Sequence, residues 1–284
     1  MDAPSQLLWF ATPTFGAGTR VGVHVWKAKG PARHAPLFVV HGIGEHALRY
    51  ADLAGWLAAR GYDVYAPDLP GHGKSASEGG LRRCYGIDEM ADLCERLRVE
   101  IAADGRYHVV SHSMGALVSL LWRLRAARRP LSAYASAPPL ALRLAVPGWK
   151  RAASKLLFRV WPDLKLTNEI DPEMLSYDSE NVRRYREDPF VHPYSSARQY
   201  ESILAAGAEV SRRAGETGRD LVVAIGADDP IVDVASVEVF ARAAGAPFIR
   251  VASAKHEILN EASRVERYEE ILAGLSAAEA GTKS

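Results

Sequence analysis

A serine at the junction between a predicted strand and a predicted helix is the first candidate for chemistry. An apolar run ends near Val110, and a helix with apolar periodicity begins directly after Ser113. A sharp strand-to-helix turn would expose the Ser113 hydroxyl and direct amides of the helix N-terminus at a developing oxyanion. Gly115 allows the backbone to turn tightly. These features make Ser113 a candidate nucleophile, with an ordinary helix N-cap as the alternative role.

A carboxylate and an imidazole follow in the order Ser, Asp, His. The serine requires a base, and the imidazole requires a carboxylate that fixes its tautomer and orientation. Asp229 stands just past the predicted strand 221–225, and His256 follows the next predicted strand. We assign Asp229 rather than Asp228 as the acid, with capping of the next helix as the alternative for either. Other histidines compete less well because they fall in predicted strands or in the irregular middle of the chain: His24, His108 and His192.

Two glycines directly after the apolar run 37–40 form a second strand-end turn. In the segment 41–44, His-Gly-Ile-Gly, they would let a backbone amide face the nucleophile. We expect the amides of Ile43 and Met114 to form an oxyanion hole, with a plain glycine turn as the alternative. Three nearby histidines lack the carboxylate spacing of a metal site, so we expect neither metal nor cofactor: His41, His46 and His72.

The candidate residues lie at the ends of short apolar runs that alternate with longer helical patterns. This alternation predicts an α/β fold, with a mostly parallel central sheet flanked by helices. Ligands bind such sheets at the carboxyl ends of the strands. The expected strands are 21–26 at an edge, 37–40, 63–66, 107–110, 131–135, 221–225 and 248–251, and the expected helices are 50–60, 88–103, 113–128, 234–244 and 263–275.

The alternation breaks in a proline-rich stretch after residue 137. We expect residues 138–205 to be an inserted helical cap, or lid, over the carboxyl edge of the sheet. Residues 1–137 and 206–284 would then form one core domain, which suits a chain of 284 residues.

Composition excludes several classes of protein. The chain has 35 Lys and Arg against 34 Asp and Glu, so it lacks the basic excess of a nucleic-acid-binding protein. It has no apolar run of about 18 residues and no visible secretory signal, and we expect a cytoplasmic protein. Cys84 and Cys94 are expected to be buried thiols in a reducing compartment.

The sequence resembles the α/β-hydrolase superfamily, specifically its monoacylglycerol lipase and lysophospholipase branch. The resemblance implies that Ser113 is the nucleophile, Asp229 the acid and His256 the base, and that Ile43 supplies an oxyanion amide. Five collinear segments carry it: HGIGEHALRY (41–50), DLPGHGKS (68–75), SHSMGA (111–116), GADDPIVD (226–233) and KHEILNE (255–261).

The chain departs from this family's pattern at the serine turn and after the base. Ser111 and Ala116 replace the usual outer glycines of the turn, and Leu259 replaces a second histidine of the mammalian-type lipases. Glu45 and Arg49 match polar pocket positions of the family, with a surface pair between them as the alternative.

The cap sequence bears on the substrate. From Trp149 to Trp161 apolar residues recur at helical spacing among lysines and arginines. Such a helix suits contact with amphiphiles, membranes or micelles, with packing on the core as the alternative. The candidate apolar lining of an acyl-chain pocket is Ile43, Met114, Leu140, Leu142, Leu156, Leu157, Met174 and Ile231.

We therefore expect a serine carboxylic-ester hydrolase that acts on monoacyl lipids, in the manner of a monoacylglycerol lipase, through an acyl-enzyme. The substrate is a small acyl ester or monoacyl lipid, and no nucleic-acid partner is expected. A lysophospholipase, a general carboxylesterase and a serine aminopeptidase are alternatives that keep the same triad. A non-catalytic ligand receptor on the same fold is the alternative of another class. Contact through the cap would make the cytoplasmic protein peripherally membrane-associated.

Overall fold

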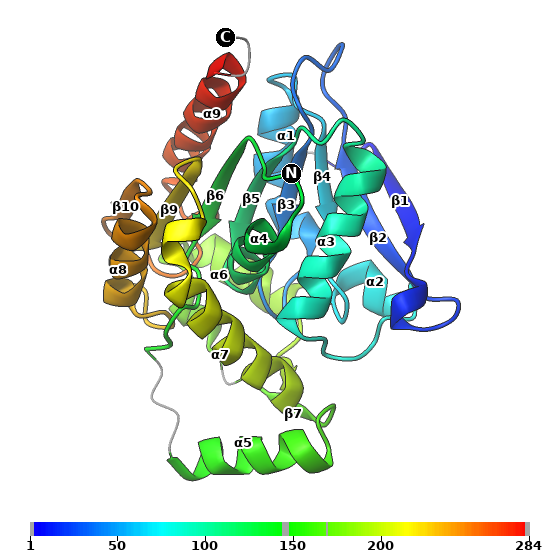
Figure 1. Cartoon of the computed structure of the whole chain (residues 1–284), viewed down its shortest axis with the longest axis vertical. Coiled ribbons are helices and arrows are strands. Elements are labelled where there is room, and N and C mark those ends of the chain that lie inside the picture. Colours follow the sequence, from blue (N-terminus) through cyan, green and yellow to red (C-terminus); the bar gives the residue numbers. More distant parts are fainter. Residues whose placement is uncertain (1–2, 144–147, 169, 282–284) are drawn as a thin grey trace.

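One sheet organises the molecule. The computed structural model describes residues 3–143, 148–168 and 170–281, and of residues 148–153 only the backbone. In this part of the chain eight strands form the central sheet, in the order β1-β2-β4-β3-β5-β6-β9-β10 (Figure 1). The strands are β1 (Gln6–Ala11), β2 (Arg20–Trp26), β3 (Leu37–Val40), β4 (Val64–Pro67), β5 (His108–His112), β6 (Ser132–Ser136), β9 (Leu221–Gly226) and β10 (Phe248–Val251).

The sheet is parallel from β4 to β10, and β2 runs antiparallel to both of its neighbours. The expectation that residues 21–26 form an edge strand is wrong, because β1 pairs along the outer side of β2. The alternating pattern suggested a half-buried strand, but its polar position is buried as well. His24 contacts Asp68 through Nε2 at 3.0 Å, and the amide of Gly22 donates to the hydroxyl of Ser75 at 2.9 Å.

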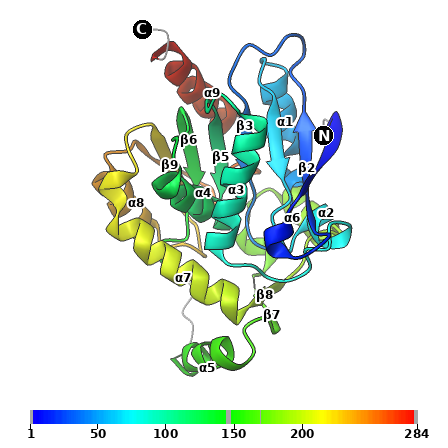
Figure 2. The ribbon, with the colours of Figure 1, turned by 45° about the vertical axis from the view of Figure 1, so that its right-hand side comes forward.

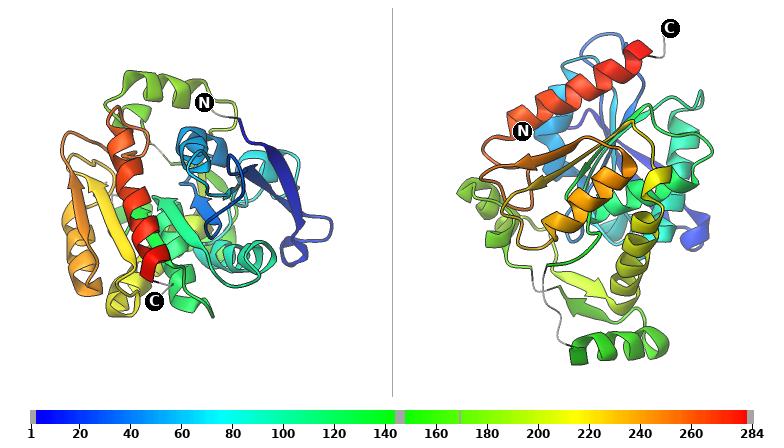
Figure 3. Two further views of the ribbon diagram at one scale, coloured as in Figure 1. Left: turned by 90° about the horizontal axis from the view of Figure 1, so that it is seen from above. Right: turned by 60° about the vertical axis from the view of Figure 1, so that its left-hand side comes forward.

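Helices cover both faces of the sheet, as Figure 3 shows from two directions. One apolar cluster packs α3, α4 and α8 against one face, and a second packs α1 and α9 against the other. This layering confirms the predicted fold class. The helices are α1 (Ala51–Ala58), α2 (Gly73–Ser77), α3 (Ile87–Ile101), α4 (Met114–Arg125), α8 (Val234–Ala244) and α9 (Arg264–Gly281).

The chain between β6 and β9 leaves the sheet and returns. Besides helices, the expected helical cap contains two short strands, β7 and β8, which pair with each other. The expected boundary between residues 205 and 206 falls inside α7, a continuous helix that packs on α3 and α4. Helix α5 packs on α7 at one end of the molecule (Figure 2). The elements are α5 (Gly148–Val160), β7 (Lys165–Thr167), α6 (Ser179–Glu187), β8 (Tyr194–Ser196) and α7 (Ala197–Arg212).

Two further expectations concern single features. Cys84 and Cys94 are free and buried, as predicted, and burial raises the pKa of the Cys94 thiol to about 12. Across the described ranges, no helix combines the length and the apolar character that crossing a membrane requires.

Candidate active site

Ser113 lies in a strained turn between β5 and α4. Its φ is +50° and its ψ is −121°, in a region that residues other than glycine rarely adopt. The turn brings the start of α4 so close to β3 that a Cβ on Gly115 would lie 2.3 Å from the carbonyl oxygens of Val40 and His41. The Ser113 side chain does not cap the helix. Its hydroxyl is therefore available for contacts outside α4.

The structure brings Ser113, His256 and Asp229 into one hydrogen-bonded chain. Nε2 of His256 lies 2.9 Å from the Ser113 hydroxyl oxygen, and Nδ1 lies 2.7 Å from Oδ2 of Asp229. The other oxygen of Asp229 accepts the amides of Ile231 and Val232 at 2.8 and 2.9 Å. The three side chains thus have the order and contacts of a nucleophile, a base and an orienting acid.

Burial and neighbouring charges shift the pKa values of His256 and Asp229. Burial alone would lower the pKa of His256, but the Asp229 carboxylate, with smaller contributions from Glu257 and Glu45, outweighs burial and raises that pKa above the ordinary value. Burial would raise the pKa of Asp229, and contact with His256 keeps it below the ordinary value instead. Asp228 points elsewhere and accepts the Tyr177 hydroxyl at 3.4 Å.

The glycine turn after β3 lies directly against the serine. A Cβ on Gly42 would lie 3.3 Å from Cβ of Ser113, and Ile43 lines the same small cavity as Ser113. Met114 is the first residue of α4, so its amide has no acceptor within the helix. Both predicted oxyanion donors therefore belong to the two turns that meet at Ser113.

Glu45 and Arg49 pair with each other, but in the interior rather than on the surface. Oε2 of Glu45 accepts Nε of Arg49 at 3.0 Å. Oε1 accepts the amide of Gly42 at 2.6 Å and the hydroxyl of Tyr50 at 2.7 Å. Glu45 thereby fixes the backbone that precedes Ile43.

Arg49 also links this turn to the loop that carries His256. One of its terminal nitrogens donates to Oε2 of Glu257 at 2.5 Å, and Asn181 on α6 donates to the same oxygen at 2.8 Å. Burial opposes ionisation of both glutamates. Arg49 outweighs burial at Glu257 and lowers its pKa, whereas burial and the charge of Glu257 raise the pKa of Glu45.

The cavity beside Ser113 is small. It holds about 20 Å³, which is room for one water molecule, whereas ligand pockets commonly hold about 300–1,000 Å³. Part of its wall belongs to the segment between β6 and β9. The lining residues are Gly42, Ile43, Glu45, His112, Ser113, Ile170, Leu175, Tyr185, His256 and Glu257.

Most of the predicted acyl-chain lining lies away from this cavity. Leu156 and Leu157 are on α5, where Leu156 is 63% exposed. Leu140 is half-buried and packs against the core, and Ile231 is buried beside Asp229. The amphipathic pattern predicted a helix with an apolar face, but it could not show what that face contacts.

Several lining residues were not predicted. His112 was part of the quoted serine motif; its ring centroid lies 4.8 Å from that of His256. Burial and the neighbouring His256 lower its pKa to about 3. Glu257 adjoins His256 in the sequence, and this adjacency was its only signal. Leu175 and Tyr185 stand in the irregular segment, where no pattern marked them.

The structure has room for the residues at which the chain departs from the family pattern. The hydroxyl of Ser111 lies 2.7 Å from that of Ser119 on α4 and donates to the carbonyl of Tyr134 at 3.2 Å. The added side chain therefore has hydrogen-bond partners between strand and helix. Ala116 and Leu259 are both buried.

The three histidines considered as metal ligands do not converge. Nε2 of His46 contacts Asp188 at 2.8 Å. The rings of His41 and His72 pack together, and each directs Nδ1 at a backbone carbonyl. Among the residues that the structure describes, no group of three His, Cys, Asp or Glu side chains could hold a metal.

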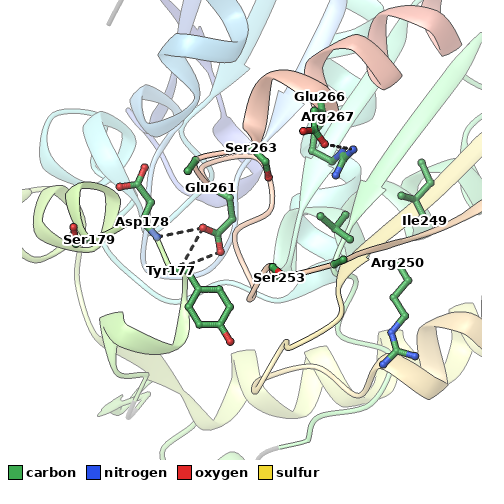
Figure 4. Close-up of a pocket in the computed structure, with 13 residues that line it drawn as sticks. Tyr177, Asp178, Ser179, Ile249, Arg250, Ser253, Glu261, Ser263, Glu266 and Arg267 are labelled. Carbon is green, nitrogen blue, oxygen red and sulfur yellow. Dashed lines mark hydrogen bonds and ion pairs between the residues drawn. The ribbon is translucent and has the colours of Figure 1, made fainter.

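A larger surface hollow is lined by residues 177–179, residues 249–253 and residues around Glu261 and Arg267 (Figure 4). It holds about 700 Å³ and includes Tyr177, Ser253 and Ser263, but none of the Ser113, His256 and Asp229 side chains lines it. Glu261 at its wall accepts the amides of Tyr177 and Lys255. The hollow is thus separate from the serine site, and Glu261 ties the His256 loop to the segment before α6.

The sheet, the serine turn and the converging strand ends define an enzyme with the α/β-hydrolase fold. A family model described as serine aminopeptidase, S33, matches residues 31–263, and the chain belongs to that family.

Sequence relatives support the same assignment. A monoacylglycerol lipase of Mycolicibacterium smegmatis is 28% identical over 228 residues, which are 77% of this chain and 78% of that one. An uncharacterized abhydrolase domain-containing protein of Dictyostelium discoideum is 26% identical over 198 residues, which are 69% of this chain but 21% of that protein.

A solved structure extends the comparison. The crystal structure of a Paleococcus ferrophilus monoacylglycerol lipase matches with a TM-score of 0.83 and 27% identity, over 91% of this chain and 99% of that one. These findings confirm the resemblance to the monoacylglycerol lipase branch, whose members are serine ester hydrolases.

Proposed function

We propose that the chain hydrolyses carboxylic esters of monoacyl lipids, as a monoacylglycerol lipase does. The observation that carries this proposal is the contact of His256 with both Ser113 and Asp229, at 2.9 and 2.7 Å. The names of the relatives supply the substrate class. Ser113 is the nucleophile, His256 the general base and Asp229 the residue that orients the base.

The reaction proceeds in two halves. The Ser113 oxygen attacks the ester carbonyl carbon while its proton passes to Nε2 of His256. The tetrahedral intermediate collapses, the bond to the leaving oxygen breaks, and His256 gives its proton to that oxygen. Water then attacks the acyl-enzyme, gives a proton to His256, and the free acid leaves as Ser113 regains its proton.

The amides of Ile43 and Met114 stabilise the negative oxygen of both tetrahedral intermediates. An amide fixed in place needs no reorganisation as charge develops, and loss of one such donor costs about 10²–10³ in kcat. Glu45 supports this arrangement by holding the amide of Gly42, one residue before Ile43, at 2.6 Å.

The part of the cap that covers Ser113 must move for substrate to enter. Ile170, Leu175 and Tyr185 close the cavity over Ser113 to about 20 Å³, which cannot hold an acyl chain. Leu140 and Ile231 are candidate contacts of that chain once the cap opens, and Leu156 and Leu157 remain candidates only through movement of α5.

The outer end of the cap meets the lipid surface that supplies the substrate. Val160 and Trp161 are 75% and 62% exposed, and Lys155 and Arg159 are exposed on the same helical segment. Exposed apolar side chains with basic neighbours favour the interface of an anionic membrane. The chain therefore associates with membranes peripherally.

A substrate panel tests the proposal with the Ser113→Ala variant as control. It comprises p-nitrophenyl esters of increasing chain length, a monoacylglycerol, a lysophosphatidylcholine and an aminoacyl anilide. Monoacylglycerol turnover should exceed that of the other lipids and disappear in Ser113→Ala. Turnover of lysophospholipid, short esters or anilide alone would retain the triad and replace the substrate. Absence of all turnover by folded protein would favour a ligand receptor.

A further inference from the structure

The hydrogen bonds to the carboxylate of Glu257 all go to one of its two oxygens. Oε2 accepts hydrogen bonds from Arg49 at 2.5 Å, Asn181 at 2.8 Å and Asn260 at 3.2 Å. Oε1 accepts none from the residues that the structure describes. Glu257 is nevertheless 3% exposed and lines the cavity beside Ser113. Among the described residues, this oxygen is not one of the fully enclosed polar atoms that lack a partner. Because Glu257 lines the cavity beside Ser113, its second oxygen can accept a hydrogen bond from a donor that arrives with the substrate.

The position of Glu257 fits the leaving-group side of the reaction. His256 must give a proton to the leaving oxygen, so the leaving alcohol lies next to His256. Glu257 follows His256 in the chain, and its amide donates to the carbonyl of Leu175 at 2.8 Å. The side chain is held further by Arg49 and Asn181, so its free oxygen has a fixed place.

The charges around the cavity disfavour an anionic leaving group. The lining contains Glu45 and Glu257, and among the described residues it contains no lysine or arginine. The nearby Arg49 gives Nε to Glu45 and a terminal nitrogen to Glu257. A phosphate would therefore meet two carboxyl groups and a guanidinium that already has its partners, whereas a hydroxyl can donate to Glu257 without competing for Arg49.

We propose that Glu257 is a specificity-determining residue: its Oε1 accepts a hydrogen bond from a hydroxyl of the leaving alcohol and selects neutral polyol esters over phosphate-bearing ones. This inference rests on the proposed ester hydrolysis, and it assigns the head-group preference of that same site. The accepting oxygen belongs to the core loop, and two residues of the cap, Leu175 and Asn181, help to hold Glu257 in place.

The test uses three esters with one acyl chain: a monoacylglycerol, the corresponding acylglycerol phosphate and a p-nitrophenyl ester. Wild type should prefer the monoacylglycerol over the acylglycerol phosphate in kcat/KM. In Glu257→Gln, an amide oxygen at the Oε2 position keeps the contacts with Arg49 and Asn181, and an NH₂ group replaces the free acceptor. The preference should fall about tenfold, as expected for loss of a hydrogen bond to a charged group.

Controls separate this outcome from others. Glu238→Gln makes the same chemical change at a 42% exposed position on α8, outside the cavity lining, and should leave the preference unchanged. An unchanged preference in Glu257→Gln, with p-nitrophenyl ester hydrolysis retained, would overturn the inference and leave the proposed function intact. Failure of wild type to hydrolyse any of the three esters would instead overturn the proposed function.

A measurement on wild type alone covers the case in which Glu257→Gln does not fold. Free glycerol and glycerol 3-phosphate are compared as competitive inhibitors of p-nitrophenyl ester hydrolysis. Glycerol should inhibit at the lower concentration. Stronger inhibition by glycerol 3-phosphate would contradict the selection against phosphate that Glu257 is proposed to provide.

Discussion

Oδ2 of Asp229 lies 2.7 Å from Nδ1 of His256, and both side chains are buried. Because Asp229 also accepts two backbone amides through its other oxygen, its carboxylate is held in the charged form. A charged Asp229 keeps the proton of neutral His256 on Nδ1. Nε2 is then free to accept the proton of the Ser113 hydroxyl, which lies 2.9 Å away.

This relationship predicts the pH dependence of ester hydrolysis. The base must be neutral, and Asp229 raises the pKa of His256 above its ordinary value of 6.5. kcat/KM should therefore rise with pH and reach half its plateau above pH 6.5. Removal of the carboxylate in Asp229→Asn leaves burial opposed only by the weaker effects of Glu257 and Glu45, so the midpoint should move to lower pH and kcat should fall by about 10⁴. A midpoint that stays in place in Asp229→Asn would contradict the assignment of Asp229.

The close approach of α4 to β3 predicts that Gly115 tolerates no side chain. In Gly115→Ala the new Cβ would lie 2.3 Å from two backbone oxygens, which cannot move aside independently of β3. The free energy of unfolding should fall by about 1–3 kcal/mol or more, as for overpacked cores. Gly274→Ala on α9 is the matched control because no atom lies within 4 Å of its added Cβ. It should raise stability by about 0.5–1 kcal/mol. Equal effects of the two changes in thermal unfolding would refute the steric argument.

The contact between His46 of the core and Asp188 of the cap is expected to help hold the cap closed. Asp188 ends α6, and its Oδ2 lies 2.8 Å from Nε2 of His46 in the core. Asp188→Asn weakens this contact but retains the oxygen that accepts the amide of Phe190. Hydrogen exchange in α6 should accelerate about tenfold, because the charge that strengthens a partly buried hydrogen bond is removed.

The matched control for the cap is Glu187→Gln. It removes a charge from the same helix, at a side chain that is 61% exposed and pairs with Arg183 within α6. Exchange in α6 should be nearly unchanged there. If Asp188→Asn and Glu187→Gln behave alike, the cap is not held by the His46 contact.

The exposed apolar residues at the end of α5 and directly after it predict binding to lipid vesicles. Trp161→Ser removes an apolar side chain that is 62% exposed, and burial of such a side chain contributes about 1.5–3 kcal/mol. Co-sedimentation with anionic vesicles should weaken about tenfold. Val239→Ser, at a 65% exposed position on α8, should have little effect. Equal loss in both variants, or equal binding of wild type to neutral and anionic vesicles, would count against the proposed surface.

The sequence predicted the features that depend on chain order and strand ends. A serine after one buried strand, an acid after a second and a histidine after a third must meet at the carboxyl edge if the sheet is parallel. The structure brings Ser113, Asp229 and His256 together there. The role of each residue remains a prediction until activity is measured.

The features that the sequence did not predict depend on contacts between distant segments. Glu257, Arg49 and Asn181 meet although they stand in three separate parts of the chain, and no local pattern marks their pairing. Strand β1 was missed because residues 6–11 lack the clear alternation of β2. Helix α5 showed its apolar face in the sequence, but whether core or solvent covers that face depends on how the whole segment folds back.

The central claim is that Ser113 is the activated nucleophile, and covalent labelling tests it most directly. Wild type, Ser113→Ala and His256→Ala are each treated with a fluorophosphonate, followed by mass spectrometry of the intact chain and of its peptides. We predict one adduct per wild-type chain, on the peptide that contains Ser113, none in Ser113→Ala and strongly slowed labelling in His256→Ala. An adduct on another residue, or labelling of folded wild type no faster than of His256→Ala, would contradict the account.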